Sequence, residues 1–344
     1  SGKAPNTPAP PNTNQVSFPS HTGATLLTMV SRCALSRVNK NSAPMPRSKP
    51  SITIYISVAP VWDGNETWLV LGGAGVFGAF PLAYAVIVDA LTIPLTAMLI
   101  GLIFRGVAFE FRFKAAESHR RFWDSAFMWG SLLAIFSQGI IVGAILHGFP
   151  LHGRQFAGSP LDWLTPFNLF CGLALIATYA LLGATWLILK SDGALLRLMR
   201  RLTRTLLLLF LIAMAVISLW TPLTLERIAE RWFSLPNVFY FLPVPLLVLT
   251  LSLWLWRLSQ RADSHAAPFI LTLGLLFLGF SGLGISIWPW IIPPNVTLWQ
   301  AAAPVASQLF MLVGTLLIVP VILAYTAWSY WVFRGKVRAD EGYH

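Results

Sequence analysis

Long runs of apolar residues, separated by short polar segments, fill the chain from about residue 60 to its end. Several runs extend for about 20 residues or more without an Asp, Glu, Lys or Arg, and about 20 apolar residues cross a bilayer as one helix. The pattern therefore predicts an all-α, polytopic transmembrane helix bundle. The eight predicted spans are residues 67–87, 89–104, 125–147, 163–189, 205–222, 236–256, 268–290 and 305–333.

The first two predicted spans form one continuous apolar run from Trp68 to Phe104. As a single helix this run would be about 55 Å long, whereas the hydrocarbon core of a bilayer is about 30 Å thick. The chain must therefore turn back inside the run. Asp89 is the one acid within it, so the sequence predicts a tight hairpin at Val88–Ala90 with Asp89 as an external turn residue.

Basic residues gather in alternate connections between the predicted spans. Fifteen Lys and Arg residues follow the second, fourth, sixth and eighth spans, whereas the other connections hold only Arg154, Arg227 and Arg231. Short loops rich in Lys and Arg face the cytoplasm. The C-terminus and the start of the first span are therefore predicted to be cytoplasmic.

The first 58 residues differ from the rest and are rich in Pro, Ser, Asn, Thr and Lys. Such composition predicts a disordered or non-native leader, followed by a transmembrane domain at residues 59–338 and a short cytoplasmic tail at residues 339–344. The whole chain is 56% hydrophobic and 11% charged, whereas soluble domains are about a quarter charged. The net charge of +11 does not indicate nucleic-acid binding, because no soluble basic segment is interleaved with stacking aromatic residues.

A polar cluster opens the first predicted span, with Trp62, Asp63, Asn65, Glu66 and Trp68 in the segment WDGNETW. One interpretation is an N-terminal helix cap, where acids are favoured by the helix dipole. The other is a polar notch at the cytoplasmic side, where carboxylates pass protons or bind a polar partner. The two interpretations are compatible.

Further charges lie at the edges of the next two spans. Arg105, Glu110 and Arg112 follow the second span in the segment FRGVAFEFR, and their default role is anchoring at the cytoplasmic surface with local ion pairs. Asp124 opens the third span, where capping is the expected role.

Polar residues without charge and small residues supply the remaining packing signals. The polar residues in or near the spans are predicted to form hydrogen bonds between helices; they are Gln138, Asn168, Ser281 and Gln308. The glycines do not complete a clean GxxxG pattern, so the sequence gives only a diffuse indication of where helices cross. All six histidines lie in tails, loops or span ends, so no haem ligand and no metal site is predicted in this chain.

The segment APVWDGNETWLV at residues 59–70 resembles the signature of subunit II of cytochrome bd-type quinol oxidases. FPLAYA, FRGVAFEFR, QGIIVGAILHGF and the C-terminal run from TLWQAAAP follow in the family's order, and the resemblance covers about residues 57–338. FRGVAFEFR and GLGISIWPWIIPP are closer to the cyanide-insensitive branch. The resemblance implies a heterodimer with a subunit I that carries haem b and haem d, oxidises quinol and reduces dioxygen to water in a bacterial inner membrane.

In this resemblance the present chain ligates no haem and supports subunit I. Asp63 and its neighbours would face subunit I and border a cytoplasmic proton route, while Arg105 and Asp124 match charges of the family's loops. A small accessory subunit is a further partner that the resemblance allows. Two features depart from the family: its first helix, with a DGFDLG-like motif, has no counterpart in residues 1–58, and Gln300 stands where an acid is common.

Two other functions remain open from the sequence. A secondary transporter has spans broken by proline near the middle of the membrane, and Pro94, Pro243, Pro245 and Pro320 lie within or beside predicted spans. No internal repeat supports this alternative. The second is an inactive remnant of subunit II that has lost the family's first helix.

Overall fold

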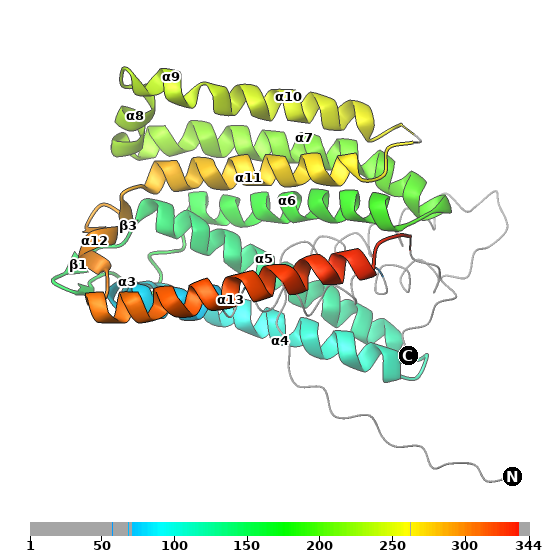
Figure 1. Ribbon diagram of the computed structural model, residues 1–344, viewed down its shortest axis with the longest axis horizontal. Coiled ribbons are helices and arrows are strands. Elements are labelled where there is room, and N and C mark those ends of the chain that lie inside the picture. Colours follow the sequence, from blue (N-terminus) through cyan, green and yellow to red (C-terminus); the bar gives the residue numbers. More distant parts are fainter. Residues whose placement is uncertain (1–56, 58–67, 69–70, 262, 337–344) are drawn as a thin grey trace, which may run out of the picture.

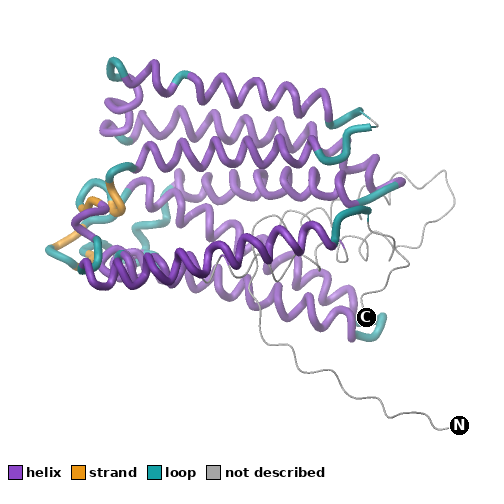
Figure 2. The backbone as a smooth tube through the Cα atoms, in the orientation of Figure 1, coloured by secondary structure: helices purple, strands orange, loops and turns teal. Residues whose placement is uncertain are grey.

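The computed structural model describes residues 57, 68, 71–261 and 263–336, and long helices run side by side through it (Figures 1 and 2). Seven helices within these residues are long and apolar enough to cross a membrane, or eight with one bent pair. The prediction of a transmembrane helix bundle is thus confirmed. The long helices are α4 (Thr92–Lys114), α5 (Arg120–His147), α6 (Pro166–Lys190), α7 (Gly193–Thr224), α10 (Pro243–Leu258, preceded by α9, Asn237–Phe241), α11 (Ala267–Ile287) and α13 (Val305–Val332).

Three of the predicted boundaries are wrong by five residues or more, and each error occurs where basic residues begin or end a helix. α4 continues to Lys114 instead of ending at residue 104, α5 begins at Arg120 instead of residue 125, and α7 begins at Gly193 instead of residue 205. Arg, Lys and Leu favour the helix, and long basic side chains extend from a span end toward water. Charge therefore marks the membrane surface here and not the end of the helix.

The predicted hairpin at Val88–Ala90 is not present, because these residues lie inside α3 (Pro81–Ala90). The helix breaks one residue later, at Leu91 between α3 and α4, and the chain also bends at Phe80, with 112° between the helix Leu71–Ala79 and α3. Pro81 occupies the first turn of α3, and proline disfavours helical geometry in the residue before it while fitting the first turn of a new helix. Asp89 is exposed in the last turn of α3.

Short elements cover one end of the bundle. They are α3, the hairpin β1 (Leu151–His152) and β2 (Gln155–Phe156), α8 (Glu226–Phe233), the hairpin β3 (Trp290–Ile292) and β4 (Val296–Thr297), and α12 (Leu298–Ala301). A core of α3, α5 and hairpin residues joins most of them and includes Val86, Phe149 and Ile292. Gly148 fits there because a Cβ would lie 1.6 Å from the Pro293 carbonyl oxygen.

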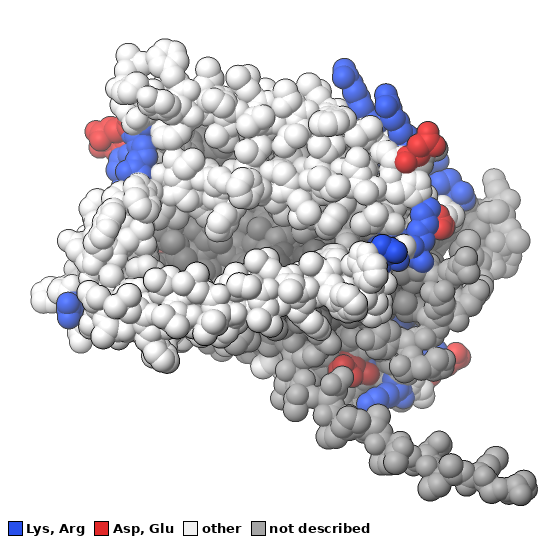
Figure 3. All heavy atoms as spheres, in the orientation of Figure 1, with Lys and Arg blue, Asp and Glu red and all other residues white. Residues whose placement is uncertain are grey.

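The opposite end carries most of the charge (Figure 3). It holds the α4–α5, α6–α7 and α10–α11 connections and the C-terminal end of α13, which are the connections predicted to be rich in Lys and Arg. We call it the basic end, and the end covered by α3, α8 and the hairpins the charge-poor end. The connections rich in Lys and Arg, which alternate along the sequence with connections poor in them, therefore lie together at one end of the bundle.

α6 lies at the centre of the bundle, with 67% of its most apolar window buried, whereas α13 has 6% buried. α4 packs on α5, α5 on α6, and α6 on both α7 and α11. Paired glycines make the crossings close. A Cβ on Gly101 would lie 2.6 Å from the Gly130 carbonyl oxygen, and one on Gly139 would lie 2.5 Å from the Cys171 carbonyl oxygen and 2.6 Å from the Gly172 Cα. The crossings are thus sharply defined, although no GxxxG pattern marked them.

α13 is held to the other helices mainly near its two ends. At the charge-poor end, the Ala79 carbonyl accepts hydrogen bonds of 2.8 Å from the Ala303 amide and from the Gln308 side chain. At the basic end, Lys190 Nζ donates to the Phe333 carbonyl over 2.6 Å. The Gln308 contact confirms the interhelical hydrogen bond predicted for that residue.

Candidate functional site

Of the five residues predicted to open the first span, one is described. Trp62, Asp63, Asn65 and Glu66 lie outside the described residues. Trp68 Nε1 donates a hydrogen bond of 3.3 Å to Thr326 Oγ1 of α13. Thr326 lies in the half of α13 nearer the basic end, so the contact brings the start of the first span toward that end.

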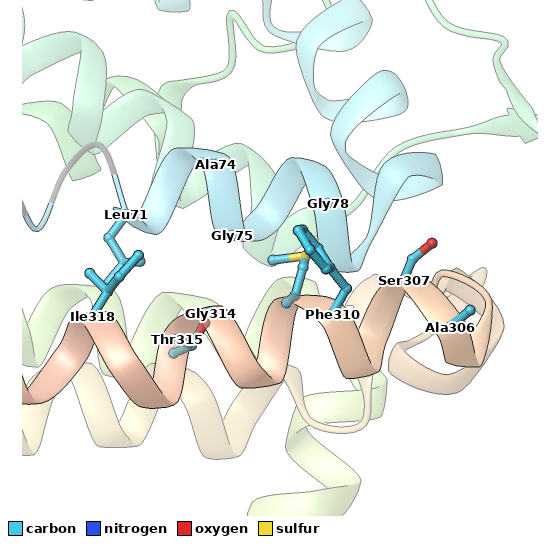
Figure 4. Close-up of a pocket in the computed structure, with 11 residues that line it drawn as sticks. Leu71, Ala74, Gly75, Gly78, Ala306, Ser307, Phe310, Gly314, Thr315 and Ile318 are labelled. Atoms are coloured by element: carbon cyan, nitrogen blue, oxygen red, sulfur yellow. The ribbon is translucent and has the colours of Figure 1, made fainter.

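The helix Leu71–Ala79 and α13 run in opposite directions beside each other and enclose an open groove of about 740 Å³ (Figure 4). Small residues of the first helix, among them Ala74 and Gly75, face Phe310 and Thr315 of α13 across it. The Met311 side chain fills the space beside Gly78, where a Cβ would lie 2.4 Å from the Met311 sulfur.

A buried ion pair joins α4 to α5 near the basic end. Arg112 Nε lies 2.6 Å from Asp124 Oδ1, and both side chains are 6% exposed. The capping role predicted for Asp124 is wrong, because α5 begins at Arg120 and no side chain caps its first turn. Glu110 is exposed. Burying two charges is costly and is offset only by close geometry, so this pair fixes one arrangement of α4 against α5.

Arg105 lies deeper than the ion pair. The sequence placed it in a loop after the second span, but it is inside α4 and only 1% exposed. It precedes Arg112 by seven residues, a rise of about 10 Å along the helix. Its backbone nitrogen faces Gly130, where a Cβ would lie 3.0 Å away. A cation within a span is rare and usually functional.

A polar contact between α5 and α6 continues this series toward the centre of the bundle. The Tyr179 hydroxyl donates to Gln138 Oε1 over 3.1 Å, which confirms the interhelical bond predicted for Gln138. Arg105 and Tyr179 are both buried in the bundle, at 1% and 7% exposed. Sequence reasoning missed Tyr179, although a tyrosine in the middle of an apolar span needs a hydrogen-bond partner. We call Arg112, Asp124, Arg105, Gln138 and Tyr179 the polar series.

The described histidines do not provide a haem site inside the bundle. His119, His152 and His265 lie in connections or at a helix boundary, and His147 ends α5. His147 Nδ1 lies 3.2 Å from the Gly143 carbonyl oxygen, and its ring meets the Phe167 ring edge-on. Among the described residues no three His, Cys, Asp or Glu side chains form a metal-binding group.

Comparison with known proteins gives the family. The profile of cytochrome bd terminal oxidase subunit II matches residues 43–333. The chain belongs to this family. The match to the family begins at residue 43. The transmembrane domain of this subunit II was predicted to begin later, at residue 59. That predicted boundary stays a prediction, since the residues around it lie outside the described part.

Curated relatives of this subunit II come from several bacteria. The chain is 29% identical over 326 residues to cytochrome bd-I ubiquinol oxidase subunit 2 of Escherichia coli K12, covering 83% of this chain and 84% of the relative. It is 24% identical over 301 residues to cytochrome bd ubiquinol oxidase subunit 2 of Bacillus subtilis 168, covering 83% and 85%. It is therefore a membrane protein of bacterial type.

A solved structure shares the fold of this subunit II. A chain of the bd oxidase from Geobacillus thermodenitrificans superposes with a TM-score of 0.65 at 18% identity, over 89% of this chain and 93% of that chain. The transporter alternative gains nothing from the prolines: Pro94 and Pro243 lie in first turns, and Pro320 lies inside α13 without ending it. Gln300, the departure from the family pattern, closes a capping box with Thr297 at the start of α12.

Proposed function

We propose that this chain is subunit II of a quinol oxidase that partners a haem-bearing subunit I and reduces dioxygen to water in the bacterial inner membrane. Family membership is the observation that carries this proposal. By resemblance to the family, subunit I would hold haem b and haem d and the quinol, and this chain would ligate none of them. The basic end would face the cytoplasm, since Lys and Arg gather there.

Within that complex we assign this chain a part in a proton route that starts at the basic end. The polar series supports the assignment, because it extends from the Arg112–Asp124 pair to the Gln138–Tyr179 contact at the middle of α6. Buried polar groups in spans are costly and typically border ion or proton pathways. Asp63 and Glu66 would join the route at its entrance, and Trp68 supports that place through its bond to Thr326.

The surface for subunit I would be formed by the helix Leu71–Ala79 and α13. Gly72, Gly73 and Gly75 have nothing within 4 Å of a built Cβ, so another helix can approach this face closely. α13 supplies the long apolar side next to it, with 6% of its most apolar window buried. Both features suit a protein neighbour.

Co-purification from detergent-solubilised membranes tests the partnership. A tagged full-length chain is expected to bring down one haem-bearing membrane subunit in equal amount, with a visible absorption spectrum of reduced haem. A folded chain without a haem-bearing partner would contradict the proposal and would favour the inactive remnant.

The proton route is tested by Asp63→Asn in the assembled complex. Quinol-driven oxygen consumption is expected to slow at least tenfold while haem content and subunit ratio stay unchanged, since the amide cannot accept and release a proton at that position. Asp89→Asn is the matched control, because Asp89 is an exposed acid on α3. Equal turnover in both variants would remove Asp63 from the route.

A further inference from the structure

The short helix α8 lies across the charge-poor end and carries two arginines on one face. It connects α7 to α9 and α10, and a segment between two spans is expected at the membrane surface. Ile228 is buried, and Trp232 Nε1 donates to Ser286 Oγ of α11 over 3.2 Å. Arg227 and Arg231 are four residues apart and therefore neighbours on the helix surface.

Backbone carbonyls are the partners of both arginines. Arg227 Nη2 donates to the Leu146 carbonyl at the end of α5, and Arg231 Nη1 donates to the Ile285 carbonyl over 3.0 Å and to the Trp288 carbonyl. Neither forms an ion pair within the described chain, although Glu226 and Glu230 share the helix. Within the described chain, the hydrogen-bond partners of both guanidinium groups are thus backbone carbonyls and not carboxylates.

Arg231 has N–H groups left for a ligand. Arg227 Nη1 also lacks a hydrogen-bond partner in the described chain, but it is buried and therefore out of reach of a ligand. Among the described residues Arg231 donates only through Nη1, so Nε and Nη2 keep three N–H groups. Burial lowers the pKa of Arg227, and the charge of Arg231 lowers it further. An anion bound at Arg231 would offset the repulsion between the two guanidinium groups.

A groove of about 400 Å³ opens beside Arg231. Asn237 adds a second polar group, and Phe241, Ile285 and Trp288 form an apolar wall. Gly284 lines the groove as well, and a Cβ built on it meets nothing within 4 Å. The groove thus combines a cationic mouth with an apolar body at the depth of the headgroups.

We propose that the groove between α8, α9 and the end of α11 binds a glycerophospholipid, with its phosphate at Arg231 and Asn237 and one acyl chain along Phe241 and Ile285. Charge complementarity decides the occupant, because the unpaired guanidinium N–H groups match phosphate oxygens. The apolar wall distinguishes a lipid from a free anion, since only the lipid buries apolar area against it. The lipid would join α8 to α11 at this surface.

Native mass spectrometry of the delipidated complex tests the proposal. Dioleoyl phosphatidylglycerol, dioleoylglycerol and inorganic phosphate are each added to the complex in separate titrations. The number of bound molecules gives the affinity of the complex for each. The phospholipid is expected to bind at least tenfold more tightly than either probe, because it alone offers both the charged contact and the chain. Equal binding of dioleoylglycerol, or binding of inorganic phosphate alone, would overturn the proposal.

Two variants locate the bound lipid. Gly284→Leu fills the groove and is expected to lower phospholipid affinity at least tenfold, while Gly282→Leu is the matched control because a Cβ there also meets open space and does not line the groove. Asn237→Asp adds a repelling charge and leaves the carbonyl contacts of Arg231 in place, with Gln155→Glu as control at the same end. Unchanged affinity in both groove variants would place the lipid elsewhere and refute the site.

Discussion

The crossing of α5 and α6 makes a prediction whose sign can be worked out from the structure. In Gly139→Ala the new methyl would lie 2.5 Å from the Cys171 carbonyl oxygen, 2.6 Å from the Gly172 Cα and 2.8 Å from the Gly172 nitrogen. All three are backbone atoms, so no side chain can move aside. Ordinary contact begins near 3.4 Å, and the helices must separate by about 0.9 Å.

Two opposing effects set the size of this change. Replacing glycine by alanine inside a helix stabilises it by about 0.5–1 kcal/mol, whereas overpacking costs about 1–3 kcal/mol and more when the backbone must shift. α6 is the most buried of the long helices, so the separation also loosens its neighbours. We expect Gly139→Ala to lower the free energy of unfolding by about 1–2 kcal/mol.

Gly282→Ala in α11 is the matched control, because a Cβ there meets nothing within 4 Å. Only the higher helix propensity of alanine acts at that position, so the free energy of unfolding is expected to rise by about 0.5–1 kcal/mol. Unfolding in mixed micelles, followed by far-ultraviolet circular dichroism, measures both variants. If Gly139→Ala were as stable as Gly282→Ala, the close crossing described here would be refuted.

Three further variants test the contacts that hold the helices together. Asp124→Leu should destabilise the chain by about 3–5 kcal/mol by leaving Arg112 charged and buried, and adding Arg112→Met should recover most of the loss in a double-mutant cycle; a double variant no more stable than the single one would argue against the pairing. Lys190→Met removes the donor to the Phe333 carbonyl, so amide hydrogen exchange should rise in the last turns of α13 and stay unchanged in α6. Trp68→Phe should cost about 0.5–1.5 kcal/mol by losing one hydrogen bond, as measured by thermal unfolding in detergent.

The spans of the bundle could be predicted because the absence of charge over 20 or more residues has one physical explanation. The end of α4 and the start of α7 could not, since basic residues at a membrane surface are compatible with a loop and with a helix. The bend at Phe80 had a signal in the following residue, Pro81, but the prediction relied on Asp89 as the one acid in the apolar run and placed the turn there.

The polar series shows what a single sequence leaves undetermined. Arg112 and Asp124 are twelve residues apart across a turn. Nothing in this spacing indicates that their side chains form a buried ion pair. Tyr179 looked like an apolar span residue until Gln138 was seen beside it. Gly101 and Gly130 form no motif in the sequence, because they lie on different helices. The two glycines become neighbours only when α4 packs against α5.

The attachment of α13 has a consequence for biosynthesis. The Ala79 carbonyl at the end of the helix Leu71–Ala79 accepts a hydrogen bond from Gln308, which lies 229 residues later in the chain. The helices from α4 to α11 are therefore synthesised before the hydrogen bond between Gln308 and Ala79 can form, because the chain is made from its N-terminus onward. A nascent chain that stops before α13 lacks one side of the proposed docking surface. In the proposed complex, subunit I could therefore dock only on chains that have been translated through α13.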